Sequence, residues 1–142
     1  MARVDFYVLP EHGGQSRQQF ACALTSKAWS AGNSVYVHTV DASEAEQLDK
    51  LLWTFRDISF VPHARIDAAE AGSVPVLIGW QDASAEADVM VNLGTEIPSA
   101  AAKFARIAEI VAGSDTERQQ ARERYRQYRE AGHELHNHVI GE

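Results

Sequence analysis

Residues 4–9, Val-Asp-Phe-Tyr-Val-Leu, decide the fold, because this apolar stretch ends at Pro10 and a glycine pair at 13–14. A short apolar run bounded by turn residues predicts a buried strand and the turn that follows it. Ser16, with Gln19 three residues later, has the pattern of a helix capping box. The chain is therefore predicted to begin as a strand, a turn and a helix.

The same succession of strand and helix continues along the chain. Residues 34–40 alternate as a strand does, and Asp41 with Glu44 predicts the start of a second helix. Two further apolar runs, at 74–78 and 89–93, are short and rich in β-branched residues, as buried strands are. This order predicts an α/β fold with a mostly parallel sheet and right-handed crossovers.

The last third of the chain is less uniform. Residues 100–111 fit a helical spacing, yet 106–111 also has the pattern of a buried strand. Ser114, with a glutamate three residues later, predicts a polar helix that ends near Gly132. The tail, residues 133–142, has no clear period, and we expect it to be frayed.

Length and composition limit the class of protein. The chain has 142 residues, which is typical of one compact domain, and we expect residues 1–142 to be a single domain. Its hydrophobic content of 45% is that of a globular protein, and its net charge of −7 argues against a surface that coats nucleic acid. No apolar run is long enough to span a bilayer, so we expect a cytoplasmic protein without a membrane segment.

The patterns that mark common enzyme sites are missing. Residues 10–15, the turn after the first strand, have neither GxGxxG spacing nor a P-loop lysine. His133, His136 and His138 lie close together, but their spacing is not that of a helical zinc site, so we expect a solvated tail. The single cysteine, Cys22, excludes an internal disulfide and is expected to be a small packed residue. We therefore expect a protein without catalytic residues, cofactor or metal.

The second helix predicts an exposed aromatic side chain. On a helical projection, Trp53 points away from the leucines that form the core face. An apolar segment follows shortly after, with Phe60, Val61 and Pro62. The sequence leaves two interpretations open: this segment folds back over Trp53, or Trp53 and the segment form an aromatic anchor for another protein.

The last helix carries a stripe of cations. When successive residues are rotated by about 100°, one face collects most of the arginines. This stripe holds Arg118, Arg122, Tyr125, Arg126 and Arg129. Ala121 and Tyr128 fall where the helix can contact the domain, and Arg124 fits neither face.

The charge of this stripe favours an anionic partner. Residues 118–129 contain five arginines and one glutamate, a local charge of +4, which leaves −11 on the rest of the chain. A charge run is often only a solvated face, but like charges at this spacing repel each other and destabilise the helix. Arginines beside a tyrosine favour an acidic peptide with a hydrophobic residue, or single-stranded nucleic acid.

Three segments carry a family resemblance at these two regions. They are residues 48–53 (Leu-Asp-Lys-Leu-Leu-Trp), 59–63 (Ser-Phe-Val-Pro-His) and 121–129 (Ala-Arg-Glu-Arg-Tyr-Arg-Gln-Tyr-Arg). Together with the opening residues 5–9 and the order of strands and helices, they make the sequence resemble the chi subunits of bacterial DNA polymerase III over nearly its whole length. Each motif alone is weak, but the three in this order and separation are specific.

The resemblance implies a non-catalytic accessory subunit in DNA replication. Its fold would be a single-domain, Rossmann-like, three-layer α/β fold, with a mostly parallel sheet of about five strands and helices on both faces. Residues 106–111 would then be the last strand. Chi subunits bridge the clamp loader, through its small subunit psi, to single-stranded DNA-binding protein. They grasp the acidic C-terminal tail of that protein, so their contact with DNA is indirect.

The resemblance also assigns residues to these partners. Arg122 would hold the terminal carboxylate of the tail, and Tyr125 and Val111 would line the pocket for its terminal phenylalanine. The other arginines of the stripe, Arg118, Arg126 and Arg129, would attract the acidic residues upstream. Psi, and in some members a helicase, would contact the second surface, which consists of Trp53, Phe60, Val61 and Pro62. A module that binds single-stranded nucleic acid directly through the stripe is the alternative.

Overall fold

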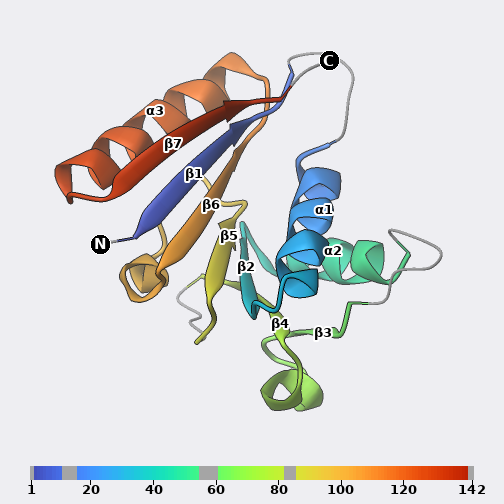
Figure 1. Cartoon of the computed structure of the whole chain (residues 1–142). Helices are drawn as coiled ribbons and strands as arrows, with labels where there is room; N and C mark the ends of the chain where they lie inside the picture. Colours follow the sequence, from blue (N-terminus) through green and yellow to red (C-terminus); the bar gives the residue numbers. More distant parts are fainter. Residues whose placement is uncertain (1, 11–15, 55–60, 82–85, 141–142) are drawn as a thin grey trace.

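The computed structural model describes residues 2–10, 16–54, 61–81 and 86–140 (Figure 1). Its helices are α1 (Arg17–Ser30), α2 (Ala42–Thr54) and α3 (Asp115–Glu130), with short 3₁₀ helices at Ala69–Ser73 and Ser99–Lys103. Its strands are β1 (Arg3–Val8), β2 (Val35–Thr39), β3 (His63–Arg65), β4 (Val76–Trp80), β5 (Val89–Asn92), β6 (Arg106–Val111) and β7 (Glu134–Val139).

All strands of the described ranges lie in one sheet, and every pair of neighbours is parallel. Their order is β3-β4-β2-β5-β6-β1-β7. This confirms the α/β, Rossmann-like fold and the assignment of 106–111 as a strand. The sheet has seven strands, however, where we expected about five. One of the two missed strands, β3, has only three residues, too few to show an alternating pattern.

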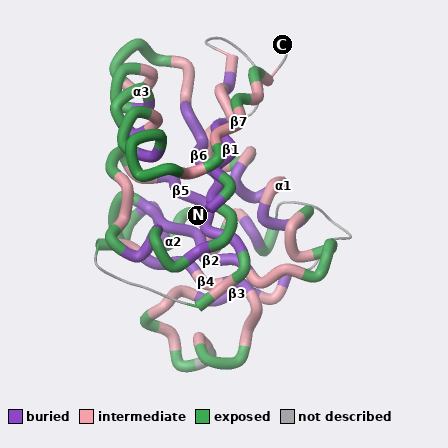
Figure 2. The backbone as a smooth tube through the Cα atoms, turned by 60° about the vertical axis from the view of Figure 1, so that its left-hand side comes forward, coloured by how far each residue is buried: buried purple, intermediate pink, exposed green. Residues whose placement is uncertain are grey.

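Helices cover both faces of the sheet, as expected. On one face, α1 and α2 bury Cys22 and Leu48 against the sheet. On the other face, α3 packs through Ala121 and Tyr128, the two residues that the helical projection predicted to contact the domain. The strands between these helices form the most buried part of the chain (Figure 2).

The helix starts predicted from the sequence are confirmed. At α1, the hydroxyl of Ser16 accepts from the N–H of Gln19, whose side chain accepts in return from the N–H of Ser16. At α2, a carboxylate oxygen of Asp41 accepts from the N–H of Glu44 at 2.8 Å. Ser114 caps α3 through its hydroxyl. These caps satisfy donors that a helix leaves unpaired at its first turn.

The tail that we expected to be frayed forms β7, so that prediction was wrong for residues 134–139. β7 pairs with β1 along its whole length, from Glu134 opposite Arg3 to Val139 opposite Val8. It lies at the edge of the sheet and is only partly covered, so its sequence lacks the continuous apolar run of a buried parallel strand. Residues 141–142 lie outside the described ranges.

A buried carboxylate on β1 fastens β7 to the sheet. Asp5 is 1% exposed, and its Oδ1 lies 2.9 Å from Nε2 of His138 on β7, whose ring stacks on Tyr7. Arg3 and Arg106 lie 3.2 Å and 3.6 Å from its Oδ2. Burial alone would raise the pKa of Asp5, but the hydrogen bonds from His138 and Arg3 and the charges of the two arginines outweigh burial. The pKa of Asp5 therefore lies below its usual value of 3.8.

We predict that Asp5→Asn removes part of the acid sensitivity of the fold. A carboxylate whose pKa is lower in the folded than in the unfolded state stabilises the fold at any pH above its unfolded pKa. This contribution is lost as the pH falls from the unfolded pKa through the folded pKa. At neutral pH the variant should be less stable by about 1–3 kcal/mol, because Arg3, Arg106 and His138 lose the negative charge and one of the two oxygens of the carboxylate. Its free energy of unfolding in urea should then fall less between about pH 5 and pH 3 than that of the unchanged chain.

Asp67→Asn is the matched control for this measurement. Asp67 pairs with Arg65, but its side chain is 53% exposed, so its removal should leave the acid dependence unchanged. If Asp5→Asn keeps the full acid dependence, Asp5 does not fasten β7 in the way described.

Candidate functional site

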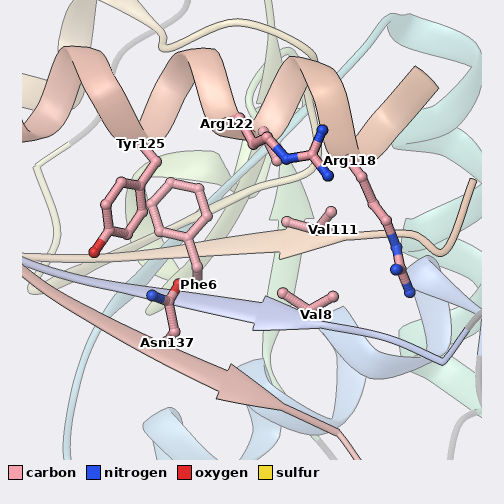
Figure 3. Close-up of a pocket in the computed structure, with 8 residues that line it drawn as sticks. Phe6, Val8, Val111, Arg118, Arg122, Tyr125 and Asn137 are labelled. Atoms are coloured by element: carbon pink, nitrogen blue, oxygen red, sulfur yellow. The ribbon is translucent and has the colours of Figure 1, made fainter. Parts of the chain in front are cut away.

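A cleft of about 420 Å³ opens between α3 and the carboxyl ends of β1 and β6 (Figure 3). Val8 and Val111, the last residues of these strands, form its floor. Phe6 and Tyr125 form one end, with their ring centroids 5.3 Å apart, and Asn137 of β7 lies at the edge. Two residues expected to line a pocket, Val111 and Tyr125, thus both line this cleft, at the strand ends where parallel α/β folds commonly bind ligands.

Arg118 and Arg122 bring positive charge to the cleft. Both side chains project from α3, and Arg118 reaches past Val111 at the end of the floor (Figure 3). Among the described residues, neither guanidinium forms a salt bridge, and Nε of Arg118 is buried without a hydrogen-bond partner. A buried donor without an acceptor destabilises a fold by about 1–3 kcal/mol. An anionic ligand would supply the missing acceptor.

The remaining arginines of the stripe differ from each other. Arg126 donates to Glu130 at 2.7 Å and, from its Nε, to Glu123 at 3.1 Å, so its charge is balanced within the helix. Arg129 is exposed and forms no salt bridge with the described part of the chain. The stripe therefore presents three arginines without a carboxylate partner in the described ranges, where the sequence suggested four.

Arg124, which the helical projection assigned to neither face, anchors α3 to the sheet. It is 5% exposed, and its Nε donates to Glu109 on β6 at 2.9 Å while its Nη1 donates to the carbonyl of Thr95 at 3.0 Å. Glu109 is fully buried and also accepts from the Tyr128 hydroxyl at 2.7 Å and from Asn92 at 2.9 Å. This network joins three elements, α3, β5 and β6, beneath the helix that forms one wall of the cleft.

Burial and pairing act in opposite directions on this network. Burial raises the pKa of Glu109, whereas Arg124 and the hydrogen bonds from Asn92 and Tyr128 favour its charged form. Burial and the nearby Glu109 raise the pKa of the Tyr128 phenol, so Tyr128 remains a donor. Sequence reasoning missed the buried pair of Glu109 and Arg124. The signal that could have found it is the single carboxylate among the apolar residues of 106–111.

The second predicted surface is present only in part. Trp53, at the end of α2, is 49% exposed, and its ring centroid lies 4.2 Å from that of His63. His63 is held between the carbonyls of Val61 and Asp49, at 2.6 Å and 2.9 Å. Val61 is 3% exposed and packs in the core, so its prediction as a surface residue was wrong. It immediately precedes Pro62 and β3.

Two other predictions on this surface have different outcomes. Pro62 is half-buried beside β3. Phe60 lies outside the described residues, as does the rest of the apolar segment before Val61. His63, to which sequence reasoning assigned no role, is a described residue whose ring contacts that of Trp53.

The cysteine and the three C-terminal histidines, which the sequence analysis weighed as catalytic or metal-binding residues, are buried or bonded to other parts of the protein. Cys22 is buried, as predicted, and burial raises the pKa of its thiol to about 12. His133 accepts from the backbone N–H of Ala2, while His136 and His138 contact Glu134 and Asp5. The described residues contain no cluster of histidine, cysteine and carboxylates suited to a metal ion. In the same ranges, no helix is long and apolar enough to cross a membrane.

The sequence matches a known protein family. The family model described as DNA polymerase III chi subunit, HolC, matches residues 1–136. The chain belongs to the DNA polymerase III chi subunit family. It is 40% identical over 141 residues to the DNA polymerase III subunit chi of Pseudomonas aeruginosa, covering 99% of this chain and 98% of the relative.

Two relatives of lower identity match over nearly the same length. The DNA polymerase III subunit chi of Escherichia coli is 32% identical over 141 residues, covering 95% of this chain and 96% of the relative. That of Haemophilus influenzae is 31% identical over 138 residues, covering 96% of each. The family resemblance is thereby confirmed, and with it an accessory role in DNA replication as part of the DNA polymerase III complex.

We predict that Glu109→Gln destabilises the fold strongly, because it leaves Arg124 buried without a counter-charge. Removing one partner of a buried pair costs about 3–5 kcal/mol. The double variant Glu109→Gln/Arg124→Met should regain much of this loss, since it removes both charges. Urea unfolding at neutral pH measures both effects. Arg126→Ala, which removes an exposed pair on the same helix, is the control and should change stability little. A Glu109→Gln variant as stable as the unchanged chain would refute the anchoring role.

Proposed function

We propose that this chi-family chain links the polymerase III complex to single-stranded DNA-binding protein by holding the acidic C-terminal tail of that protein in the α3 cleft. One observation carries the proposal: an apolar hollow is flanked by two guanidiniums, Arg118 and Arg122, that have no carboxylate partner in the described ranges. Such a site fits a peptide end that combines an apolar side chain with a free carboxylate.

The arrangement of the cleft supports a specific role for Arg122. The last residue of a peptide carries its side chain and its carboxylate on the same Cα, so its site needs a cation close to an apolar hollow. Arg122 and Tyr125 lie three residues apart on α3 and both line the cleft above Val111. We therefore assign the terminal carboxylate to Arg122 and the terminal phenylalanine to the hollow beside Tyr125 and Val111.

The acidic residues upstream of the terminal pair would meet the rest of the stripe. Arg118 and Arg129 have no carboxylate partner in the described ranges, and they flank Arg122 along α3. Arg126 already binds Glu123 and Glu130, so we expect it to contribute least of the four. The pairing of Arg126 within α3 is the observation that supports this lower rank.

The expected affinity is moderate. Burial of one phenylalanine side chain contributes about 1.5–3 kcal/mol, and each exposed ion pair adds roughly 0.2–1 kcal/mol. After the cost of association, a dissociation constant of about 1 μM, or roughly −8 kcal/mol, is the natural scale. Binding should weaken as salt screens the arginines, because the screening length is about 10 Å at 0.1 M ionic strength.

Direct binding of single-stranded nucleic acid is the alternative function for the same surface. The charge distribution disfavours it. The chain carries a net charge of −7, and a long polyanion that extends past α3 would be repelled by the acidic remainder. The cleft also offers an apolar end for a side chain, with Phe6 and Tyr125 tilted by 56° to each other.

A second proposed contact lies at Trp53, where the psi subunit of the clamp loader would bind. The supporting observation is a half-exposed tryptophan whose ring is held against the buried His63. Tryptophan is among the side chains that most often dominate the energy of protein interfaces. Trp53 lies on α2 and the cleft lies under α3, on the opposite face of the sheet, so both partners could be bound at once (Figure 1).

We predict that Arg122→Ala weakens binding of the acidic tail more than Arg118→Ala does, and that Arg126→Ala has the smallest effect. Arg122 is assigned the terminal carboxylate next to the hollow, whereas Arg118 is assigned side-chain carboxylates and Arg126 is already paired. We expect a loss of about tenfold or more for Arg122→Ala. Calorimetric titration with the last ten or so residues of the cognate tail measures the series.

The same titration distinguishes the alternative function. A single-stranded oligonucleotide should bind the unchanged chain more weakly than the peptide does. If all three variants lose the same affinity, the stripe acts only through general charge attraction. If the oligonucleotide binds as tightly as the peptide, nucleic acid is the better candidate ligand.

We predict that Trp53→Ala lowers the affinity for psi by more than about tenfold, as expected for a tryptophan that dominates an interface. The acidic tail should bind this variant as tightly as it binds the unchanged chain, because the two surfaces lie on opposite faces of the sheet. Pull-down and titration with purified psi measure the effect. Arg122→Ala is the reciprocal control and should retain psi. Undiminished psi binding by Trp53→Ala would exclude Trp53 from the contact.

A further inference from the structure

The outer edge of β7 lies beside the cleft. β7 is the last strand of the sheet order and pairs with β1. Asn137, in the middle of β7, also lines the cleft, and α3 runs along the same end of the sheet (Figures 1 and 3). A peptide held in the cleft would therefore leave it close to this edge.

The backbone of β7 has unpaired hydrogen-bonding groups on its outer side. Glu134 and Ile140 donate their N–H groups to carbonyls of the β1 side, at 3.0 Å and 2.9 Å. The N–H and C=O of one residue in a strand point the same way, and the direction alternates along the chain. Leu135, Asn137 and Val139 therefore direct theirs away from the sheet, where the described residues supply no partner. Such a row is a template for another strand.

The side chains beside this edge suit an acidic segment. Asn137 faces the cleft, and Val139, which is on the same side of β7, is 83% exposed. Arg118 and Arg122 of α3, which line the same cleft as Asn137, have no carboxylate partner in the described ranges. A strand added to β7 would place every second side chain on the side of these arginines.

We propose that the acidic peptide held by its end in the cleft continues along β7 as an additional strand of the sheet, with alternate carboxylates facing the α3 arginines. The occupant is the acidic segment just upstream of the terminal residue, so the inference rests on the proposed function. Its support is the continuity of edge and cleft at Asn137 and the charge complementarity with α3. The added hydrogen bonds join backbone to backbone, so they stabilise the bound tail whatever its side chains are.

Amide hydrogen exchange of the full chain, measured by NMR with saturating peptide of about ten residues, tests the pairing. The N–H groups of Leu135, Asn137 and Val139 should exchange about tenfold more slowly in the complex. Those of His136 and His138 already bond to β1 and serve as controls. If the signals of Val111 and Tyr125 shift on binding while the three outer amides keep their rates, the pairing is overturned and tail capture stands. If no signal of the cleft shifts, the proposed function itself fails.

A backbone substitution gives a second test. Asn137→Pro removes an outward N–H that the β1–β7 ladder does not use, and proline is tolerated on edge strands. Asn137→Ala is the matched control, because it removes the same side chain and keeps the N–H. We expect Asn137→Pro to bind the peptide about two- to tenfold more weakly than Asn137→Ala. Equal affinities with both folds intact would overturn the inference.

Peptides methylated on single backbone nitrogens keep the test independent of how the proline variant folds. Strand pairing predicts that methylation weakens binding at every second upstream position and leaves the positions between them unaffected. A loss without this alternation, or no loss, overturns the inference. Slow exchange of the three outer amides in concentrated protein without peptide would also overturn the inference, because a second copy of the chain would then occupy the edge.

Discussion

The buried pair between Arg124 of α3 and Glu109 of β6 is the interaction on which the rest of the site depends. The pair joins α3 to an inner strand of the sheet. Tyr128 and Asn92 also donate hydrogen bonds to the Glu109 carboxylate. Because a buried charge without its partner is strongly unfavourable, the pair permits few other positions for α3. The rotation of α3 fixed in this way places Arg118, Arg122 and Tyr125 above the carboxyl ends of β1 and β6.

The same anchor gives neighbouring arginines different roles. Arg124 is buried and paired with Glu109, so it has a structural role. The charge of Arg126 is balanced by two glutamates on its own helix, and Arg122 remains available at the cleft. A segment that looks uniformly basic in the sequence is thus divided into a structural cation, a neutralised cation and cations suited to an anionic ligand. Net charge alone does not describe this surface, since burial and local pairing decide which charges a partner meets.

The parts of the fold that depend on neighbouring residues in the sequence could be predicted. The caps at Ser16, Asp41 and Ser114 and the contact face of α3 depend on residues only a few positions apart, and all are confirmed. What the sequence missed depends on distant partners. β7 is a strand because it pairs with β1 and because His138 meets Asp5, and Val61 is buried by the core around it. The cleft was anticipated at Val111 and Tyr125, but not the contribution of Phe6 and Asn137 from β1 and β7.

A single titration shows whether the cleft binds the last residue of an acidic peptide, as we propose. Calorimetry of the full chain with the final ten or so residues of its cognate single-stranded DNA-binding protein should give a dissociation constant of about 1 μM. The same peptide without its terminal phenylalanine should bind at least about tenfold more weakly, because it loses the apolar side chain that fills the hollow. Equal affinity for both peptides would refute recognition of the terminal residue in the cleft, since the tail would then be attracted by charge alone.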